Sequence, residues 1–457
     1  MKGVKIIAAL TAACILLLSL SGCSLRFSAF DELLRPPKLS GEYQGLQDSF
    51  EKAVGEDFTL STPENGDYQS AFVTFDIDSD GDEEAVVFYT SKSKPDAVSF
   101  WYFEHDNGEW KPVSSNDGLG NSVDRVIFSD LNLDGTFEII IGWNLFSGKT
   151  NKVFSSYAID REKVIAMNSY PYTYLSATDI NGDGVENIFT LTVDSTVPEH
   201  LAGYARVYNF NSQKFTLNVL SEARTDGNVS SYASVNTETV GDTKYIYVEA
   251  LKGEHDSVTE LLYWDNETSS LVSPLFDTET QTTKFSWRNT VISCFDVDGD
   301  KFLEIPTSVE MKGSSNLKDV ESNEVNDLFS ESLYFTKWIK YRNGRMTPVQ
   351  YSVINDTFGY MLNIQSSWVG RVTVVSVDGQ WSFYRWISGV NEIGDLLFSI
   401  EAYPKNSTEI DVSEYKPLGS SSNTNYYYKI TDAGTNFGVT DKNIEDRFIL
   451  TDFGGTK

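Results

Sequence analysis

The chain has 457 residues, and its 66 Asp and Glu against 36 Lys and Arg give a formal net charge of −30. This balance excludes a nucleic-acid binder, which needs a basic surface, and a protein held on anionic lipid by Lys and Arg. A hydrophobic fraction of 40% and an aromatic fraction of 13% allow buried cores, and the many Tyr, Phe, Thr and Val favour β structure. The length predicts two or three domains, or one large all-β domain with a small one.

The first segment has the features of an export signal with a lipid attachment site. Lys2 and Lys5 precede an apolar run over residues 6–20, which is shorter than the roughly 20 residues that a bilayer span needs. The run leads into the tetrapeptide LSGC, which ends at Cys23. This tetrapeptide resembles the lipobox of bacterial lipoproteins.

The lipobox resemblance implies cleavage after a signal peptide at residues 1–22 and a diacylglyceryl group on the sulfur of Cys23. The protein would then sit on the outer face of the bacterial cell membrane, on a tether formed by residues 23–40. An ordinary signal peptide with an incidental cysteine is the alternative. The mature chain keeps only one other cysteine, Cys294, so no internal disulfide is expected, and Cys294 is predicted to be a small buried residue.

Four acidic loops recur in the middle of the chain. They begin at Asp76, Asp130, Asp179 and Asp296. The spacings are 54, 49 and 117 residues, and the last is about twice the others, so a copy without the acidic loop is expected near residue 237. Each unit has an apolar strand on either side of the loop and then two more alternating strands.

Four short strands in a repeat of about 50 residues are typical of a β-propeller blade. The sequence therefore predicts a mainly β protein with a propeller of about five four-stranded blades over residues 41–355. A solenoid is the competing interpretation, but its repeats would be shorter. A helix between Glu42 and Val54 is expected to pack on the propeller, with a partner-binding helix as the alternative. Residues 356–457, where the period stops, are predicted to form a small β-rich α+β domain.

The loops carry a metal-ligand pattern when each is numbered from its first Asp. Acid or Asn stands at positions 1, 3 and 5, Gly usually at position 6, and acid usually at position 9. The candidate side-chain ligands are Asp76, Asp78, Asp80 and Glu84 in loop one, Asp130, Asn132, Asp134 and Glu138 in loop two, Asp179, Asn181 and Asp183 in loop three, and Asp296, Asp298, Asp300 and Glu304 in loop four. Oxygen donors without sulfur or imidazole favour Ca²⁺ over zinc or copper.

This pattern resembles the FG-GAP/VCBS repeats of integrin-α-type propellers, whose loops read D-x-D-x-D-G-x-x-D/E. An EF-hand is disfavoured, because position 12 holds no Glu and the flanking segments are β. The resemblance implies that each loop joins the first two strands of a blade and binds calcium through positions 1, 3, 5 and 9. It also implies a ligand from the backbone carbonyl of position 7, which belongs to Asp82, Thr136, Val185 and Phe302.

Two of the loops depart from the family pattern. Loop three has Asn187 at position 9, and Glu186 at position 8 is expected to point away from the site. Loop four has Lys301 in place of the glycine, which costs backbone strain and brings an ammonium near the ion. We therefore rank loop one first, loop two second, and loops four and three last, with a metal-free Asp/Asn/Gly turn as the alternative for each.

Enzyme signatures are weak. The histidines His105, His200 and His255 form no metal-binding spacing, and no G-x-S-x-G motif is present. We therefore expect a non-enzymatic cell-surface lipoprotein whose calcium-stabilised propeller is a binding or adhesion module for an extracellular protein or glycan. The alternative is a lyase or glycosidase that acts on an extracellular polysaccharide, since carboxylate pairs are plentiful.

Overall fold

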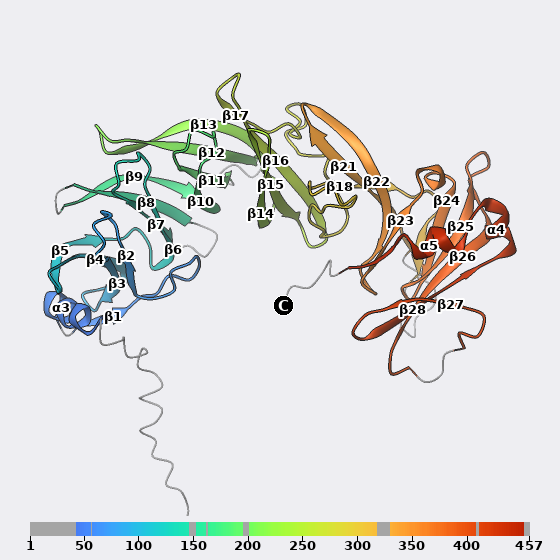
Figure 1. Cartoon of the computed structure of the whole chain (residues 1–457), viewed down its shortest axis with the longest axis horizontal. Helices are drawn as coiled ribbons and strands as arrows, with labels where there is room; N and C mark the ends of the chain where they lie inside the picture. Colours follow the sequence, from blue (N-terminus) through green and yellow to red (C-terminus); the bar gives the residue numbers. More distant parts are fainter. Residues whose placement is uncertain are drawn as a thin grey trace, which may run out of the picture.

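The computed structural model describes residues 43–55, 57–145, 152–160, 163–194, 201–317, 330–407 and 411–451. The expected signal peptide, Cys23 and the tether lie outside these residues. Within them, no helix combines the length and the apolar character needed to cross a membrane. The protein is mainly β, as predicted, and its antiparallel sheets follow one another along an arch (Figure 1).

The first three repeats form sheets one to three. Sheet one contains β1 (Phe58–Leu60), β2 (Phe72–Phe75), β3 (Glu84–Ser91), β4 (Lys94–Asp106) and β5 (Glu109–Asp117). Sheet two contains β6 (Ser122–Ser129), β7 (Glu138–Asn144), β8 (Lys152–Ile159) and β9 (Val164–Tyr172). Sheet three contains β10 (Tyr174–Thr178), β11 (Asn187–Asp194), β12 (Ala202–Asn211) and β13 (Thr216–Asp226). The consecutive strands pair in sequence order, which is the pattern of a propeller blade.

The next two repeats form sheets four and five. Sheet four contains β14 (Ser231–Val240), β15 (Thr243–Lys252), β16 (Asp256–Asp265) and β17 (Ser270–Val272). Sheet five contains β18 (Ile305–Glu310), β21 (Tyr334–Arg342), β22 (Arg345–Asn355), β23 (Tyr360–Ile364) and β29 (Phe448–Leu450). Sheet four is the expected copy without an acidic loop, because Val240 pairs with Thr243 across a tight turn in which Gly241 has a φ of 61°.

Neighbouring repeat sheets share buried side chains. Phe88 and Phe100 of sheet one pack with Trp143 of sheet two, and the Phe88 and Trp143 ring centroids are 6.3 Å apart. Tyr245 of sheet four packs with Tyr341 of sheet five in the same way, at 6.3 Å. Each fully buried large side chain stabilises the fold by about 1.5–3 kcal/mol, so the contacts between sheets hold the repeats in line without disulfides.

The expected N-terminal helix is confirmed as α3 (Gln44–Val54). Leu46 and Phe50 are fully buried against sheet one. The Phe50 ring makes edge contacts with Phe58 at 5.0 Å and with Phe72 at 5.7 Å. The apolar face of α3 is therefore covered by the first sheet, as the sequence predicted.

The C-terminal part adds a second kind of sheet. It contains β20 (Ser330–Glu331), β19 (Ser315–Leu317), β24 (Val372–Val377), β25 (Gln380–Ile387), β26 (Glu392–Pro404), β28 (Thr424–Ile430) and β27 (Lys416–Ser420), in that spatial order. The short helices η2 (Ser366–Trp368), α4 (Asp432–Phe437) and α5 (Asp441–Glu445) accompany it. Thr431 and Thr440 cap the N-termini of α4 and α5 through their side chains.

The repeat region and the C-terminal part interlock around the expected boundary at residue 355. β23 follows that boundary but pairs with β22 of sheet five, and β29 from the chain end pairs with β23. In return β19, which precedes the boundary, pairs with β24 of the C-terminal sheet. One core then joins the two parts, because Phe335 and Val353 of sheet five share it with Phe398 of the C-terminal sheet. Sheet one and the C-terminal sheet lie at opposite ends of the arch in Figure 1.

Candidate functional site

The four acidic loops have one common backbone geometry. In every loop the residue before position 1 pairs with the residue at position 9. These pairs are Phe75 with Glu84, Ser129 with Glu138, Thr178 with Asn187, and Phe295 with Glu304. In each loop the chain therefore leaves the pairing at one residue and returns at the residue opposite it. This is the connection between two paired segments that the family resemblance implied.

Four hydrogen bonds recur inside each loop and fix the side chains. The side chain at position 3 accepts one from the amide of position 5, at 3.1–3.3 Å. The carboxylate at position 1 accepts a hydrogen bond from the amide of position 6, at 2.8–3.2 Å. The carboxylate at position 5 accepts one from the amide of position 7, at 2.8–3.0 Å, which involves Asp82, Thr136, Val185 and Phe302. The side chain at position 9 accepts one from the amide of position 2, at 2.8–3.3 Å. The sequence positions proposed as ligands are thus brought together by their own loop.

Positive φ angles occur at two positions of each loop. Position 6 has φ between 72° and 97° in all four, including Lys301 at 72°. Position 4 was missed by the sequence pattern: Ser79 has φ 62° and Leu133 has φ 57°, although neither is a glycine. An L residue in this region costs about 1–2 kcal/mol, so the loops hold strain that the surrounding hydrogen bonds outweigh.

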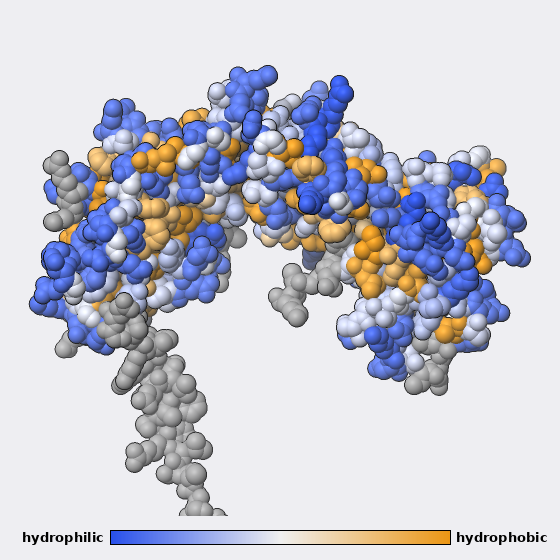
Figure 2. Space-filling model, viewed as in Figure 1, coloured by the Kyte–Doolittle hydropathy of each residue, from blue (hydrophilic) through white to orange (hydrophobic). Residues whose placement is uncertain are grey.

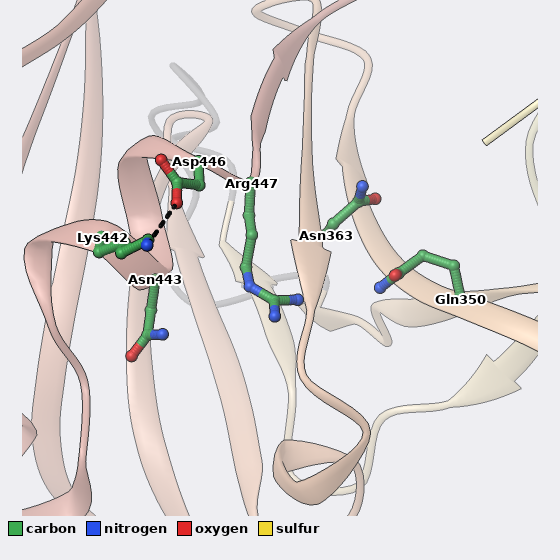
Figure 3. Close-up of a pocket in the computed structure, with 6 residues that line it drawn as sticks. All are labelled: Gln350, Asn363, Lys442, Asn443, Asp446 and Arg447. Atoms are coloured by element: carbon green, nitrogen blue, oxygen red, sulfur yellow. Dashed lines mark ion pairs between the residues drawn. The ribbon is translucent and has the colours of Figure 1, made fainter. Parts of the chain in front are cut away.

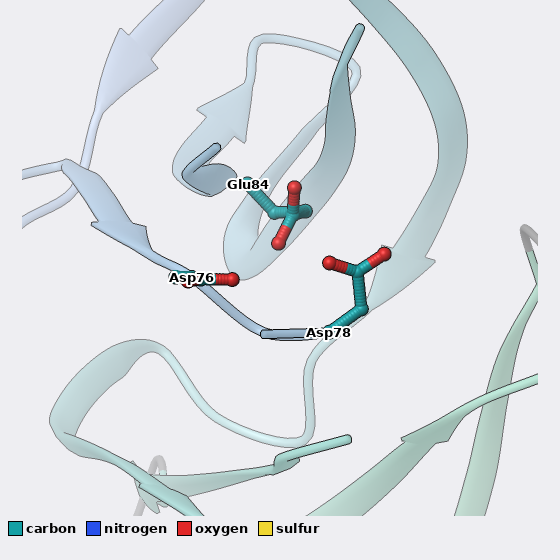
Figure 4. A group of neighbouring side chains, drawn as sticks. All are labelled: Asp76, Asp78 and Glu84. Carbon is teal, nitrogen blue, oxygen red and sulfur yellow. The ribbon is translucent and has the colours of Figure 1, made fainter. Parts of the chain in front are cut away.

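Loop one has the geometry of a metal site. Carboxylate oxygens of Asp76, Asp78 and Glu84 all lie within 4.8 Å of one another, and the three side chains converge in Figure 4. The Oδ1 atom of Asp76 is buried and accepts no hydrogen bond from any described residue. Burial raises the pKa of Glu84 to about 7, against the lowering effect of the Ile77 amide and with a further rise from Asp78. Several anionic oxygens face one another here without a cation, which suits a hard divalent ion.

Loop two has the same backbone hydrogen bonds as loop one, with Asn132 at position 3 in place of an acid. Asn132 Nδ2 donates to Asp134 Oδ2 at 2.9 Å, and burial raises the pKa of Glu138 to about 7. Loop two also contacts loop one, since Ser79 Oγ donates to the Gly135 carbonyl at 2.7 Å. The two best-ranked loops therefore lie on the same edge of adjacent sheets.

Loop three has an amide in place of an acid at position 9, as its sequence shows. Asn187 Oδ1 accepts from the Ile180 amide at 3.3 Å, so position 9 closes the loop without adding a charge. Glu186 points away and accepts a hydrogen bond from Ser129 Oγ at 2.7 Å, as expected. Lys244 of sheet four donates to the Asp179 carbonyl at 2.6 Å.

Loop four has the acids in place but also has a cation from the protein. Oxygens of Asp296, Asp298 and Asp300 lie within 4.8 Å of one another. Lys340 of β21 forms ion pairs with Asp298, Asp300 and Glu304. No feature of the loop itself predicts this lysine, because it lies 40 residues from Asp300 in sequence.

Cys294 behaves as predicted. Its side chain is buried, and burial and the nearby Glu249 raise the pKa of the thiol. It lies 3.6 Å from Thr259 Oγ1 and contacts no histidine base among the described residues. Cys294 is therefore a packing residue.

A polar cleft lies between sheet five and α5, and the sequence pattern did not indicate it. Six of its lining side chains are Gln350, Asn363, Lys442, Asn443, Asp446 and Arg447 (Figure 3). Two adjoining cavities of about 340 and 650 Å³ share Gln350 and Arg447, so together they form one extended cleft. Asp446 Oδ2 lies 4.0 Å from Lys442 Nζ, and Arg447 has no carboxylate partner within the described part of the chain.

The aromatic residues do not form an exposed platform. No Trp or Tyr of the described residues is in the exposed class, and the largest buried side chains include Trp143 and Trp338. The surface in Figure 2 is mostly hydrophilic, with smaller hydrophobic areas along the sheets. The Trp and Tyr side chains therefore contribute mainly to the cores, and the cleft is lined by polar and charged side chains.

Comparisons with known proteins find solved structures of low similarity to the chain. No protein-family model matches it. No curated protein matches it. The exotype rhamnogalacturonan lyase YesX is 10% identical, with a TM-score of 0.28, over 75% of this chain and 66% of the lyase. An exo-β-1,3-galactanase from Phanerochaete chrysosporium is 9% identical, with a TM-score of 0.24, over 82% of this chain and 96% of the enzyme. A GH43 β-1,3-galactosidase is 12% identical, with a TM-score of 0.25, over 82% of this chain and 77% of that chain.

These neighbours overturn one sequence expectation, that the chain is not an enzyme. Each of the three is named as an enzyme that acts on a glycan, so we withdraw the non-enzymatic expectation. Identities of 12% or less and TM-scores of 0.28 or less assign no reaction and no substrate to this chain. Its chemistry is therefore argued from its own residues.

Proposed function

We propose that the chain is an exported lipoprotein of the FG-GAP/VCBS repeat type, anchored through Cys23 on the outer face of the bacterial cell membrane. Its five repeat sheets are the blades of a propeller-like scaffold that calcium stabilises at loops one, two and three. The scaffold carries the polar cleft, which takes an extracellular carbohydrate polymer.

The observation that carries the calcium proposal is the buried Asp76 Oδ1. This oxygen has no hydrogen-bond partner among the described residues and lies in a loop with two further carboxylates, Asp78 and Glu84. A buried anionic oxygen without a partner is costly, and a bound Ca²⁺ removes that cost. The same backbone geometry in loops two and three extends the proposal to them.

Removal of calcium tests this part. Extracellular modules bind calcium with Kd of about 10⁻⁴–10⁻³ M, and at free calcium tenfold above Kd each site contributes about 1.4 kcal/mol to stability. Chelation should therefore lower the melting temperature, and added Ca²⁺ should restore it. An unchanged melt after confirmed metal removal would contradict the proposal.

The cleft supports the carbohydrate part. The guanidinium of Arg447 and the side-chain amides of Asn363 and Asn443 border it in Figure 3. Amides and a guanidinium fork are donors that suit sugar hydroxyls and carboxylates. Catalysis on the same polymer is the second candidate function, because Asp446 and Lys442 place a carboxylate and an ammonium 4.0 Å apart beside Arg447.

A glycan array together with a polysaccharide degradation screen tests the cleft. Binding without product release supports a binding role, and product release supports the enzyme. Arg447→Ala should lower retention or turnover at least about tenfold, the loss of one charge-assisted contact. Arg345→Ala is the matched control, because this exposed arginine lies on β22 of the same sheet but outside the cleft. Equal effects of both variants, or no interaction with any glycan, would contradict the proposal.

A further inference from the structure

Loop four is occupied by a lysine from the neighbouring strand. Lys340 Nζ lies 3.2 Å from Asp298 Oδ2 and 3.1 Å from Glu304 Oε1, and it also pairs with Asp300. The Lys340 side chain is only 17% exposed. Its ammonium therefore lies among the side chains at positions 3, 5 and 9. In the other three loops no lysine from the same repeat sheet lies at this place in the described structure.

The strand register shows that this lysine is a feature of loop four alone. Ile305, the first residue after loop four, pairs with Ile339, so Lys340 is the next residue on the partner strand. The same register position in the other acidic repeats follows Phe103, Tyr157 and Tyr208. The residue at this register position is Glu104 for loop one, Ala158 for loop two and Asn209 for loop three. Loop one thus has an additional acid at the place where loop four has a base.

Other positive charges gather at the same loop. Lys301 replaces the glycine at position 6, and the Arg342 guanidinium stacks 4.7 Å from the ring of Phe302 at position 7. A divalent cation entering loop four would meet an ammonium already in contact with its ligands.

We propose that the Lys340 ammonium is the resident cation of loop four, so that this loop keeps the calcium-loop backbone but needs no metal. The proposal rests on the proposed function in that loops one to three bind calcium. Loop four, and with it sheet five, then stays ordered at calcium concentrations that empty the other loops.

Calcium stoichiometry in the full mature chain tests the proposal, measured by equilibrium dialysis with ⁴⁵Ca²⁺. Lys340→Asn, which installs the residue of repeat three, should add one bound calcium per chain. The double variant Lys340→Asn, Asp298→Asn should lose that added ion again. Lys337→Asn is the control for net charge, because Lys337 lies on the same strand but forms no ion pair with loop four in the described structure. The stoichiometry of this control should equal that of the unmodified protein.

A melt in excess chelator provides a second measurement that does not depend on calcium. Lys340→Asn should lower the melting temperature there, because it leaves three carboxylates without their cation, whereas Lys337→Asn should not. The proposal would be overturned if Asp298→Asn alone lowered the calcium stoichiometry by one. It would also be overturned if Lys340→Asn left the stoichiometry, or the melting temperature in chelator, unchanged. If the unmodified protein binds no calcium at all, the proposed function fails, and the melt in chelator alone decides the role of Lys340.

Discussion

Loop one and loop four have the same backbone hydrogen bonds, but the neighbouring strand places a different charge beside their carboxylates. In both, position 1 accepts the amide of position 6 and position 9 accepts the amide of position 2. In loop one the register position on the next strand is Glu104, and in loop four it is Lys340. The comparison teaches that local hydrogen bonds build the loop, whereas the adjacent strand decides which charge faces its acids.

The largest expected difference comes from position 3 of each loop. Asp78 and Asp298 both accept the amide of position 5 at 3.2 Å, and an Asn at either position keeps that acceptor oxygen. At free calcium a hundredfold above Kd, a bound ion adds about 2.7 kcal/mol, so Asp78→Asn should remove most of that increment. Asp298→Asn should leave the calcium-dependent part of stability unchanged. Urea unfolding with and without calcium measures both, and equal losses would break the comparison.

The pH dependence of the calcium-free protein should differ in sign between Glu84 of loop one and Asp300 of loop four. The pKa of Glu84 is raised from 4.5 to about 7 by burial, so its favourable contribution is fully present below about pH 4.5 and is lost as pH rises through 7. The pKa of Asp300 is lowered by Lys340, so its contribution is present above its unfolded pKa and is lost only as pH falls into the acid range.

Urea unfolding in chelator at pH 5 and pH 8 measures this difference. The unmodified protein should lose about 1–2 kcal/mol per raised loop glutamate over this range, after allowance for solvent screening. Glu84→Gln should remove about a third of the slope, because Glu138 and Glu260 have the same raised pKa and keep the rest. Asp300→Asn should leave the slope between pH 5 and pH 8 intact. If Glu84→Gln and the unmodified protein had the same change in unfolding free energy between pH 5 and pH 8, burial of the Glu84 carboxyl would not be what limits calcium-free stability.

The smallest expected difference concerns position 6. Gly81 has φ 97° and Lys301 has φ 72°, and only glycine adopts these angles without strain. Lys301→Gly should stabilise the protein by about 0.5–1 kcal/mol, whereas Gly81→Lys should destabilise it by about 1–2 kcal/mol. Thermal melts at saturating calcium measure both. A destabilising Lys301→Gly would show that the lysine side chain contributes more to loop four than its backbone strain costs.

The loops could be predicted from the sequence because their geometry is local. All four recurring hydrogen bonds join residues within the nine positions of one loop, so Asp, Gly and Glu at fixed offsets are sufficient to specify it. The positive φ of Ser79 and Leu133 escaped prediction because neither is a glycine, and the signal for it lies in the other repeats, which have Gly182 and Gly299 at the same position. The helix α3 and the loop-free hairpin of sheet four follow from short-range periodicity and turn residues in the same way.

The sequence by itself therefore determined the mainly β class, the repeat of strands and acidic loops, and the positions of the acids in those loops. Only the tertiary structure decided that Lys340 enters loop four, that β29 returns to sheet five, and that Arg447 opens onto a cleft beside Gln350. These three features depend on pairing between residues far apart in the chain. A shift of one residue in strand register would point Lys340 to the opposite face, and no local pattern encodes that register.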